Sequence, residues 1–283
     1  MDNKIDTILE CVKKKSESFY QFKLEEILES ITNYEEKSAI NYIIDEELKK
    51  YDKIESLKNI VSNLQKLELP EQRSPEWYEL RKGLLTASSL ASALGEDHYK
   101  SREQLIYDKT STEEVPYISN PITEWGVKYE EIATKFYEYL NGVKIIEFGL
   151  IPHPKFNVFG ASPDGICSNE SPDKYIGRML EIKCPPKRKF TKTVPKHYWY
   201  QMQGQLECCN LEKCDFLQVK IIEYSNFEEY SKDIYNINDE IKWGYTKNQL
   251  PKGCTFSYRM KNELKLTYIY PDFFKTDDDY KKW

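Results

Sequence analysis

Proline and glycine divide the chain into two parts of different character. The first 69 residues contain neither, whereas all 13 prolines and all 11 glycines of the 283-residue chain lie after them. Because both residue types interrupt helices, the first part can form long helices and the second is broken into shorter elements. We therefore predict a helical extension at 1–69 and a separate domain at 70–283.

Apolar residues in the first part recur at helical spacing. Examples are Ile5, Ile8 and Val12, and further along Ile40, Ile44 and Leu48. This period predicts amphipathic helices. One interpretation is a small bundle that packs on itself or on the next domain, and the other is an appendage that binds a partner.

The second part alternates helical and strand-like segments. Ser74 and Pro75 predict the cap and first position of a helix that breaks at Gly83. The further helices predicted are 86–94, 124–140, 195–209 and 227–243, and the strands are 143–151, 157–161, 174–183, 216–223 and a tyrosine-rich run at 256–270. This order predicts an α/β or α+β fold.

The bulk properties exclude some protein classes. No apolar run reaches the about 18 residues of a membrane span, and the N-terminus lacks the pattern of a secretory signal. Seven cysteines at irregular spacing predict a reducing compartment. The net charge of −6 argues against a broadly basic nucleic-acid binder, although a local groove can still be positive. We expect an intracellular, non-secreted protein without a membrane partner.

The run MLEIKCPP, residues 179–186, combines a strand-like pattern with an acid and a base. Alternation places Glu181 and Lys183 on one face, and Leu180 and Ile182 on the other. Taken alone, this pattern fits an ordinary ion pair on the surface of a sheet.

A second acid lies upstream in GASPDGIC. Its Pro-Asp-Gly sequence around Asp164 fits a β-turn at a hairpin. The next strand carries Glu181 and Lys183, so two carboxylates and a lysine would meet at the sheet. Two converging carboxylates can hold Mg²⁺, and the carbonyl of Ile182 is a further oxygen ligand. A lysine beside the ion can orient or deprotonate an attacking water.

A third acid, Glu130, lies in the WGVKYEEIA segment of the predicted helix 124–140. Tyr129 and Ala133 belong to the apolar stripe of that helix, so Glu130 borders the core. An isolated helical glutamate is usually a solvated side chain. Only its combination with Asp164 and Glu181 makes Glu130 a candidate ligand.

Five segments of the second part together resemble the lambda-exonuclease-like nucleases, also called YqaJ-type viral recombinases, of the PD-(D/E)xK superfamily. They are WYELRKGLLTASS, WGVKYEEIA, GASPDG, LEIKCP and YWYQMQGQL, in the order of the family. The resemblance implies a restriction-endonuclease-like core for 70–283, with a central mixed sheet flanked by helices. Residues 1–69 would be an all-helical extension outside this match.

The resemblance also implies roles for individual residues. Those that resemble the metal-binding and catalytic set are Asp164, Glu181, Ile182 through its carbonyl, Glu130, and Lys183 as the catalytic lysine. Those that resemble the pocket for DNA and its terminal 5′ phosphate are Arg81, Ser88, Ser162, Gln201 and Gln203. An arginine fork and a serine in the first turn of a helix both suit a phosphate. The alternatives are a surface arginine and a helix cap.

The implied activity is a Mg²⁺-dependent exonuclease, with Mn²⁺ able to substitute, that digests duplex DNA from the 5′ end and leaves 3′ overhangs for viral recombination and replication. The implied partners are double-stranded DNA ends, a single-strand-annealing protein and further copies of the chain, because phage relatives form trimers. The implied location is the cytoplasm or nucleus of the infected cell, or the virion. Two other hypotheses stay open: an endonuclease of the same superfamily, and a non-catalytic scaffold that binds DNA ends.

Overall fold

The computed structural model groups the chain into two compact units, each built from segments distant in sequence. The first unit comprises Met1–Ser111, Gly142–Glu181 and Val194–Asp215, and the second comprises Thr112–Asn141, Ile182–Thr193 and Phe216–Trp283. The structure describes residues 2–14, 18–111, 120–237, 240–261, 266–273, 276 and 278–279. Each unit is described by itself.

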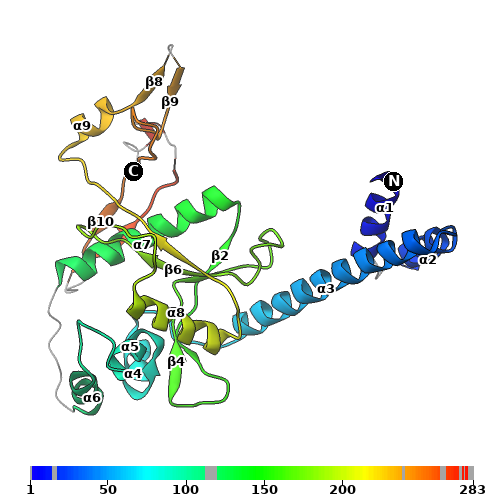
Figure 1. The fold of residues 1–283 in the computed structure, drawn as a ribbon. Helices are drawn as coiled ribbons and strands as arrows, with labels where there is room; N and C mark the ends of the chain where they lie inside the picture. Colours follow the sequence, from blue (N-terminus) through cyan, green and yellow to red (C-terminus); the bar gives the residue numbers. More distant parts are fainter. Residues whose placement is uncertain are drawn as a thin grey trace. The chain divides into compact units, whose positions relative to one another are not determined.

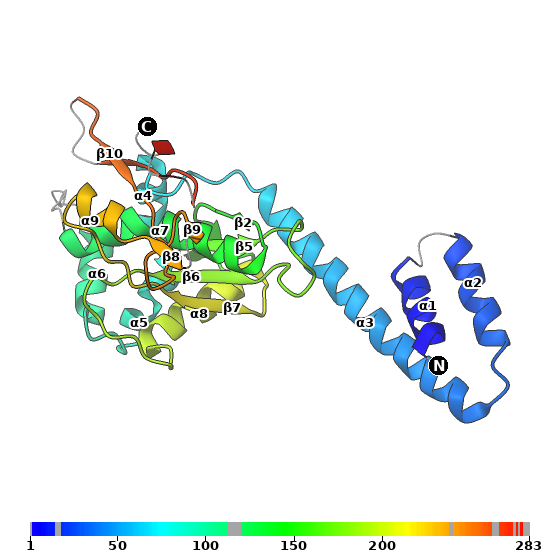
Figure 2. The ribbon, with the colours of Figure 1, turned by 90° about the horizontal axis from the view of Figure 1, so that it is seen from above.

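The first unit begins with the helices α1 (Asp2–Lys13), α2 (Ser18–Glu29) and α3 (Tyr34–Gln65), as Figures 1 and 2 show. The side chain of Asn33 caps α3 by accepting a hydrogen bond from the Glu36 N–H. Helix α1 packs against both α2 and α3. In the described part of residues 1–69, the predicted helical character is confirmed.

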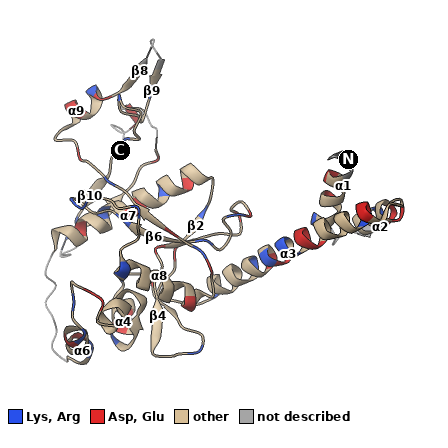
Figure 3. Cartoon of the chain, viewed as in Figure 1, with Lys and Arg blue, Asp and Glu red and all other residues tan. Residues whose placement is uncertain are grey.

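Helix α3 contributes to two hydrophobic cores. Its N-terminal half places Ile40 and Ile44 in a cluster with residues of α1. Its C-terminal half places Val61 and Leu64 in the main core of the first unit, beside residues of the sheets. Acidic and basic side chains share its remaining surface, as Figure 3 shows, in pairs such as Glu46 with Lys49. The domain boundary between residues 69 and 70 stays a prediction.

The segment after α3 forms α4 (Pro75–Gly83), in which Ser74 is the cap and Pro75 the first residue, as predicted. Trp77 of α4 is buried against Leu84 and Leu150. The chain then passes through strand β1 (Leu85–Thr86), the 3₁₀ turn η1 (Ala87–Ser89), α5 (Leu90–Ala93) and α6 (Arg102–Thr110). The predicted helix 86–94 is thus a 3₁₀ turn followed by one short α-helix.

Two sheets form the centre of the fold. In the larger, the strand order is β2 (Ile145–Ile146), β5 (Gly165–Cys167), β6 (Met179–Lys183) and β7 (Cys214–Gln218). In the smaller, the order is β1, β4 (Phe159–Ala161) and β3 (Ile151–Pro152). Strand β4 pairs in parallel with β1 and antiparallel with β3. The predicted combination of helices and mixed sheets is therefore confirmed.

Two long helices carry candidate site residues. Helix α8 (Lys196–Cys209) packs against η1, α5 and β4 in the first unit. Helix α7 (Pro121–Asn141) belongs to the second unit and buries Tyr129 and Ala133, as its apolar stripe predicts. In the described part of the chain, no helix combines the length and apolar character that crossing a membrane requires.

Several predicted elements were wrong in extent. The strands expected at 174–183 and 216–223 are the shorter β6 and β7, and three further elements differ more. The helix expected at 227–243 is only α9 (Phe227–Lys232), followed by the hairpin of β8 (Tyr235–Ile237) and β9 (Glu240–Lys242), because aromatic and β-branched residues favour strands there. The strand expected at 143–151 is divided between β2 and β3, which lie in different sheets. The strand expected at 256–270 is an antiparallel pair, β10 (Phe256–Tyr258) and β11 (Thr267–Ile269).

The close approach of Gly149 to the Pro70 carbonyl generates a stability prediction. A Cβ atom at Gly149 would lie 2.1 Å from that backbone oxygen. Gly149→Ala should therefore lower the free energy of unfolding by about 1–3 kcal/mol, measured by thermal or urea unfolding. Gly126→Ala in α7 is the control, because a Cβ there meets no described atom within 4 Å and should be neutral or stabilising. Equal effects of the two substitutions would contradict the packing argument.

Candidate active site

Two acidic residues face each other across neighbouring strands of the first unit. Asp164 directly precedes β5, and Glu181 lies in β6, where the antiparallel register pairs Gly165 with Leu180. Continuing this register by one residue sets Asp164 opposite Glu181, and directly opposed side chains are neighbours. Glu181 is fully buried, and Asp164 is partly exposed. The structure therefore brings together the two carboxylates that the sequence identifies as candidate metal ligands.

The same two carboxylates affect the pKa of the Cys214 thiol. Burial raises its pKa most, and the negative charges of Glu181, Asp215 and Asp164 raise it further. Cys214 is the first residue of β7, the strand beside β6. Both carboxylates thus lie near one partly buried thiol.

A buried amide connects the two segments that carry the acids. Gln205 of α8 donates from Nε2 to Glu181 Oε2 at 2.8 Å and to the carbonyl oxygen of Ser162 at 3.3 Å. Sequence reasoning assigned Gln201 and Gln203 of the same helix to the site and missed Gln205. The available signal was the four-residue spacing of Gln201 and Gln205, which puts both on one helix face. Gln201 is partly buried and Gln203 is exposed, and their roles stay predictions.

Further donors hold the turn that precedes Asp164. Trp77 Nε1 donates to Ser162 Oγ at 3.2 Å. Gln72 Nε2 donates to the carbonyl of Pro163 at 3.3 Å and to that of Phe148 at 2.7 Å. The turn is thus bonded to Gln72, which precedes α4, and to Trp77 in the first turn of α4.

The second unit contains the remaining predicted residues, Ile182, Lys183 and Glu130. Lys183 ends β6, two residues after Glu181, so that alternation places both side chains on the same side of the strand. Ile182 is buried, as predicted for the opposite face. Cys184 Sγ donates to the carbonyl of Tyr129 at 3.6 Å. The residue after Lys183 therefore contacts the residue before Glu130.

The helix turn that carries Glu130 is anchored by its neighbours. The Lys128 ammonium and the Tyr129 hydroxyl both bind the carboxylate of Glu223. The hydrogen bond from Lys128, followed by that from Tyr129, holds the pKa of Glu223 below its usual value. Burial raises the pKa of Tyr129 most, and its hydrogen bond to Glu223 raises it further. These contacts fix the backbone of α7 beside Glu130.

The donor set suits a hard divalent cation. Mg²⁺ is usually held by one or two carboxylates, with water and substrate phosphate as its other ligands. Asp164 and Glu181 supply that number, and backbone carbonyls follow them directly in the chain. Among the described residues, no group of three or more His, Cys, Asp and Glu side chains is arranged to hold a metal ion. The residues therefore fit a hydrated, oxygen-bound ion and not a cation fully enclosed by protein.

A separate cationic site lies at the end of α4. Arg81 Nη2 donates to Ser88 Oγ at 2.7 Å, and the guanidinium lies over the Trp77 ring, 4.8 Å from its centroid. Burial lowers the pKa of Arg81. Ser88, in η1, is exposed. The structure therefore joins the two residues, seven apart, that the sequence assigned to a phosphate pocket.

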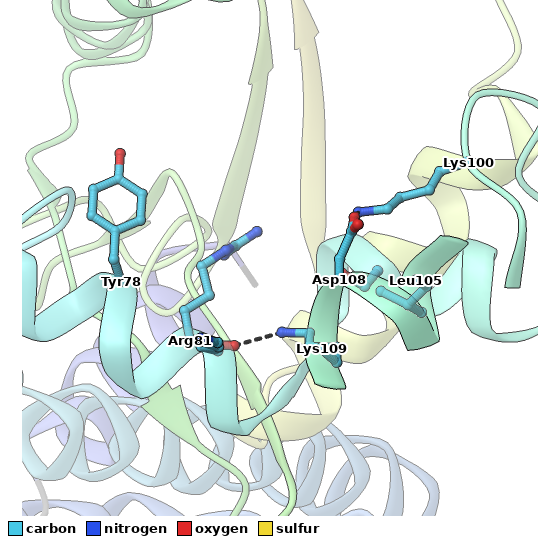
Figure 4. Close-up of a pocket in the computed structure, with 8 residues that line it drawn as sticks. Tyr78, Arg81, Lys100, Leu105, Asp108 and Lys109 are labelled. Atoms are coloured by element: carbon cyan, nitrogen blue, oxygen red, sulfur yellow. Dashed lines mark hydrogen bonds and ion pairs between the residues drawn. The ribbon is translucent and has the colours of Figure 1, made fainter. Parts of the chain in front are cut away.

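Lys109 of α6 binds backbone carbonyls at the end of α4, next to this site. Its Nζ donates to the carbonyls of Arg81 at 2.6 Å and Leu84 at 2.7 Å, where the negative end of the α4 dipole favours a cation (Figure 4). Burial lowers the pKa of Lys109, and the positive charges of Arg81 and Lys100 lower it further. A cavity of about 270 Å³ opens here, lined by Tyr78, Arg81, Lys82, Ser89, Lys100, Leu105, Asp108 and Lys109. Four cationic side chains line the cavity against one carboxylate. Lys100 pairs with that carboxylate, Asp108, and Lys109 binds the carbonyls, so the net positive charge that would attract an anion comes from Arg81 and Lys82.

Viral proteins are among the relatives of this chain. An uncharacterized protein of Acanthamoeba polyphaga mimivirus is 35% identical over 236 residues, which is 75% of this chain and 42% of the relative. A protein of African swine fever virus (strain Badajoz 1971 Vero-adapted) is 26% identical over 161 residues, which is 48% of this chain and 46% of the relative. The chain thus spans less than half the length of these two relatives.

Two solved structures are similar to this chain. A crystal structure of LHK-Exo in complex with dAMP is 30% identical, covers 51% of this chain and 73% of that chain, and has a TM-score of 0.41. A crystal structure of the alkaline exonuclease LHK-Exo from Laribacter hongkongensis is 29% identical, covers 52% and 74%, and has a TM-score of 0.40.

A family model matches the part of the chain that holds the site. The YqaJ-like viral recombinase domain matches residues 76–212, a range that contains every site residue predicted from the sequence. The resemblance inferred from the motifs is therefore confirmed. Residues 76–212 of this chain match the YqaJ-like viral recombinase domain, which is just under half of its length.

Proposed function

We propose that this chain is a Mg²⁺-dependent DNA exonuclease that digests linear duplex DNA from its 5′ ends, with Mn²⁺ able to replace Mg²⁺. The observation that carries the proposal is the facing of Asp164 and Glu181 across β5 and β6, within a YqaJ-like viral recombinase domain. The cationic site of Arg81 and Ser88 in the same unit supports it. The 3′ overhangs produced would serve viral recombination with a single-strand-annealing partner.

In this proposal, Asp164 and Glu181 would hold the ion together with the Ile182 carbonyl, and Glu130 would join them once the ion is bound. Bound there, Mg²⁺ would act as a Lewis acid and neutralise charge on the scissile phosphate. Lys183 would orient or deprotonate the attacking water. The water oxygen forms the new P–O bond, the P–O bond to the 3′ oxygen of the leaving nucleotide breaks, and that oxygen takes up a proton from solvent.

The proposed end-binding pocket uses Arg81, Ser88, Ser162, Gln201 and Gln203. Arg81 donates to two oxygens of a terminal 5′ phosphate, and Ser88 adds a hydroxyl donor. A 5′-phosphate pocket suits an enzyme that begins at an end. An endonuclease of the same superfamily has no need of one, so this pocket favours the exonuclease.

Digestion of linear duplex DNA labelled at either end tests the reaction directly. With Mg²⁺, label should be released from 5′-phosphorylated ends first, and EDTA should stop the release. Lys183→Ala should lower kcat by about 10²–10⁴-fold, the usual worth of a general base. Closed circular duplex is the control and should stay intact. If wild-type protein cuts circles, the endonuclease hypothesis replaces this one, and if it cuts neither substrate, the scaffold hypothesis does.

Arg81→Ala separates the end-binding step from the chemistry. Loss of charged hydrogen bonds to phosphate should raise KM for 5′-phosphorylated duplex by about 10–100-fold and leave kcat nearly unchanged. The same substitution should have little effect on 5′-hydroxyl ends, which serve as the internal control. Unchanged kinetics on phosphorylated ends would refute the role of Arg81.

Lys109→Met tests whether the contact beneath the pocket matters for binding. Without its two hydrogen bonds to the Arg81 and Leu84 carbonyls, the last turn of α4 should loosen. We expect KM for phosphorylated ends to rise about tenfold or less, because these are charge-assisted hydrogen bonds. Lys109→Arg keeps the charge and should have a smaller effect. Equal effects of both variants would assign Lys109 a purely steric role.

A further inference from the structure

The side chain of Gln205 is enclosed next to the two carboxylates. Only 1% of the residue is exposed, although glutamine is usually a surface residue. Its Nε2 donates two hydrogen bonds, one to Glu181 Oε2 and one to the Ser162 carbonyl. The orientation of the amide follows from its partners, since a carboxylate and a carbonyl both accept hydrogen bonds and only the NH₂ group can donate to them.

The oxygen of the same amide, Oε1, differs from Nε2 in having no hydrogen-bond partner among the described residues. Gln205 Oε1 is also buried. Burying a carbonyl oxygen without a donor costs free energy, and an ordered water is the usual remedy where a site is polar. Oε1 and Nε2 share one carbon, so a water bound to Oε1 would be held by the same amide that binds Glu181.

The position of Gln205 is set by close packing of its helix. The preceding residue, Gly204, lets α8 approach β4 and η1. A Cβ on Gly204 would lie 3.0 Å from Phe159 Cζ and 3.1 Å from Ala87 Cβ. Buried neighbours on α8, among them Met202 and Cys208, leave Gln205 little freedom to move. The amide is therefore presented from a rigid support.

We propose that Gln205 is a positioning residue for the divalent cation at Asp164 and Glu181. Its Nε2 fixes one oxygen of Glu181 and the carbonyl of Ser162, two residues before Asp164, and so holds the two carboxylates at a constant distance from each other. Its Oε1 accepts a hydrogen bond from a water of the hydrated ion. The inference rests on the proposed function, because it assumes that the carboxylate pair binds a divalent cation.

Gln205→Met is the test, because methionine is similar in length and apolar. Mn²⁺ binding to the protein without DNA, measured by electron paramagnetic resonance, should weaken about 10–100-fold, as is typical when a residue that orients a metal ligand is lost. The Mg²⁺ concentration for half-maximal digestion should rise by a similar factor. Activity at saturating Mg²⁺ should recover in large part.

Val61→Ala provides the control for general destabilisation. Val61 is fully buried in the main core, and its apolar side chain forms no hydrogen bonds. Its truncation should therefore lower Tm and leave Mn²⁺ affinity unchanged. If Gln205→Met does not fold, Gln205→Asn takes its place, since its shorter side chain cannot reach both partners.

The outcomes separate this inference from the proposed function. Wild-type protein that binds no Mn²⁺ and digests no DNA overturns the proposed function and this inference with it. Wild-type protein that binds and digests, alongside a folded Gln205 variant with unchanged Mn²⁺ affinity, overturns the inference alone. A variant whose affinity falls only as far as that of Val61→Ala at equal Tm also overturns it, because the effect is then structural.

Discussion

In the antiparallel pairing of β5 with β6, Gly165 lies opposite Leu180, and every feature of the acidic site depends on that register. A slip of one residue would turn Glu181 to the other side of the sheet and replace it by an apolar neighbour. The core resists such a slip, because Met179, Leu180 and Ile182 are all buried. Hydrophobic packing of the strand thus fixes where its charged residue lies.

Burying Glu181 requires compensation, because a carboxylate removed from water loses its hydration. The amide of Gln205 supplies one strong hydrogen bond, which is short at 2.8 Å. A divalent cation would supply far more, since its charge opposes both carboxylates at once. The burial of Glu181 beside the partly exposed Asp164 therefore supports the proposed cation.

The sequence predicted those features that local chemistry decides. The Ser74 cap with Pro75 and the long helix α7 follow from nearby residues. The Pro-Asp-Gly turn was expected at a hairpin, but it joins β4 and β5, which lie in different sheets. The sequence did not predict the division of residues 143–151, where Gln72 from a distant segment binds the Phe148 carbonyl and Pro70 contacts Gly149. Gln205 was missed for the same reason, because its partners lie 24 and 43 residues away in the chain.

The Trp77 indole joins the cationic site to the turn that carries Asp164. Its ring lies under the Arg81 guanidinium, and its Nε1 donates to Ser162 Oγ. Because Trp77 is buried, its indole is held in one position and keeps both its contact with Arg81 and its hydrogen bond to Ser162. The guanidinium of the cationic site and the hydroxyl of Ser162, two residues before Asp164, are therefore both held by the same buried ring.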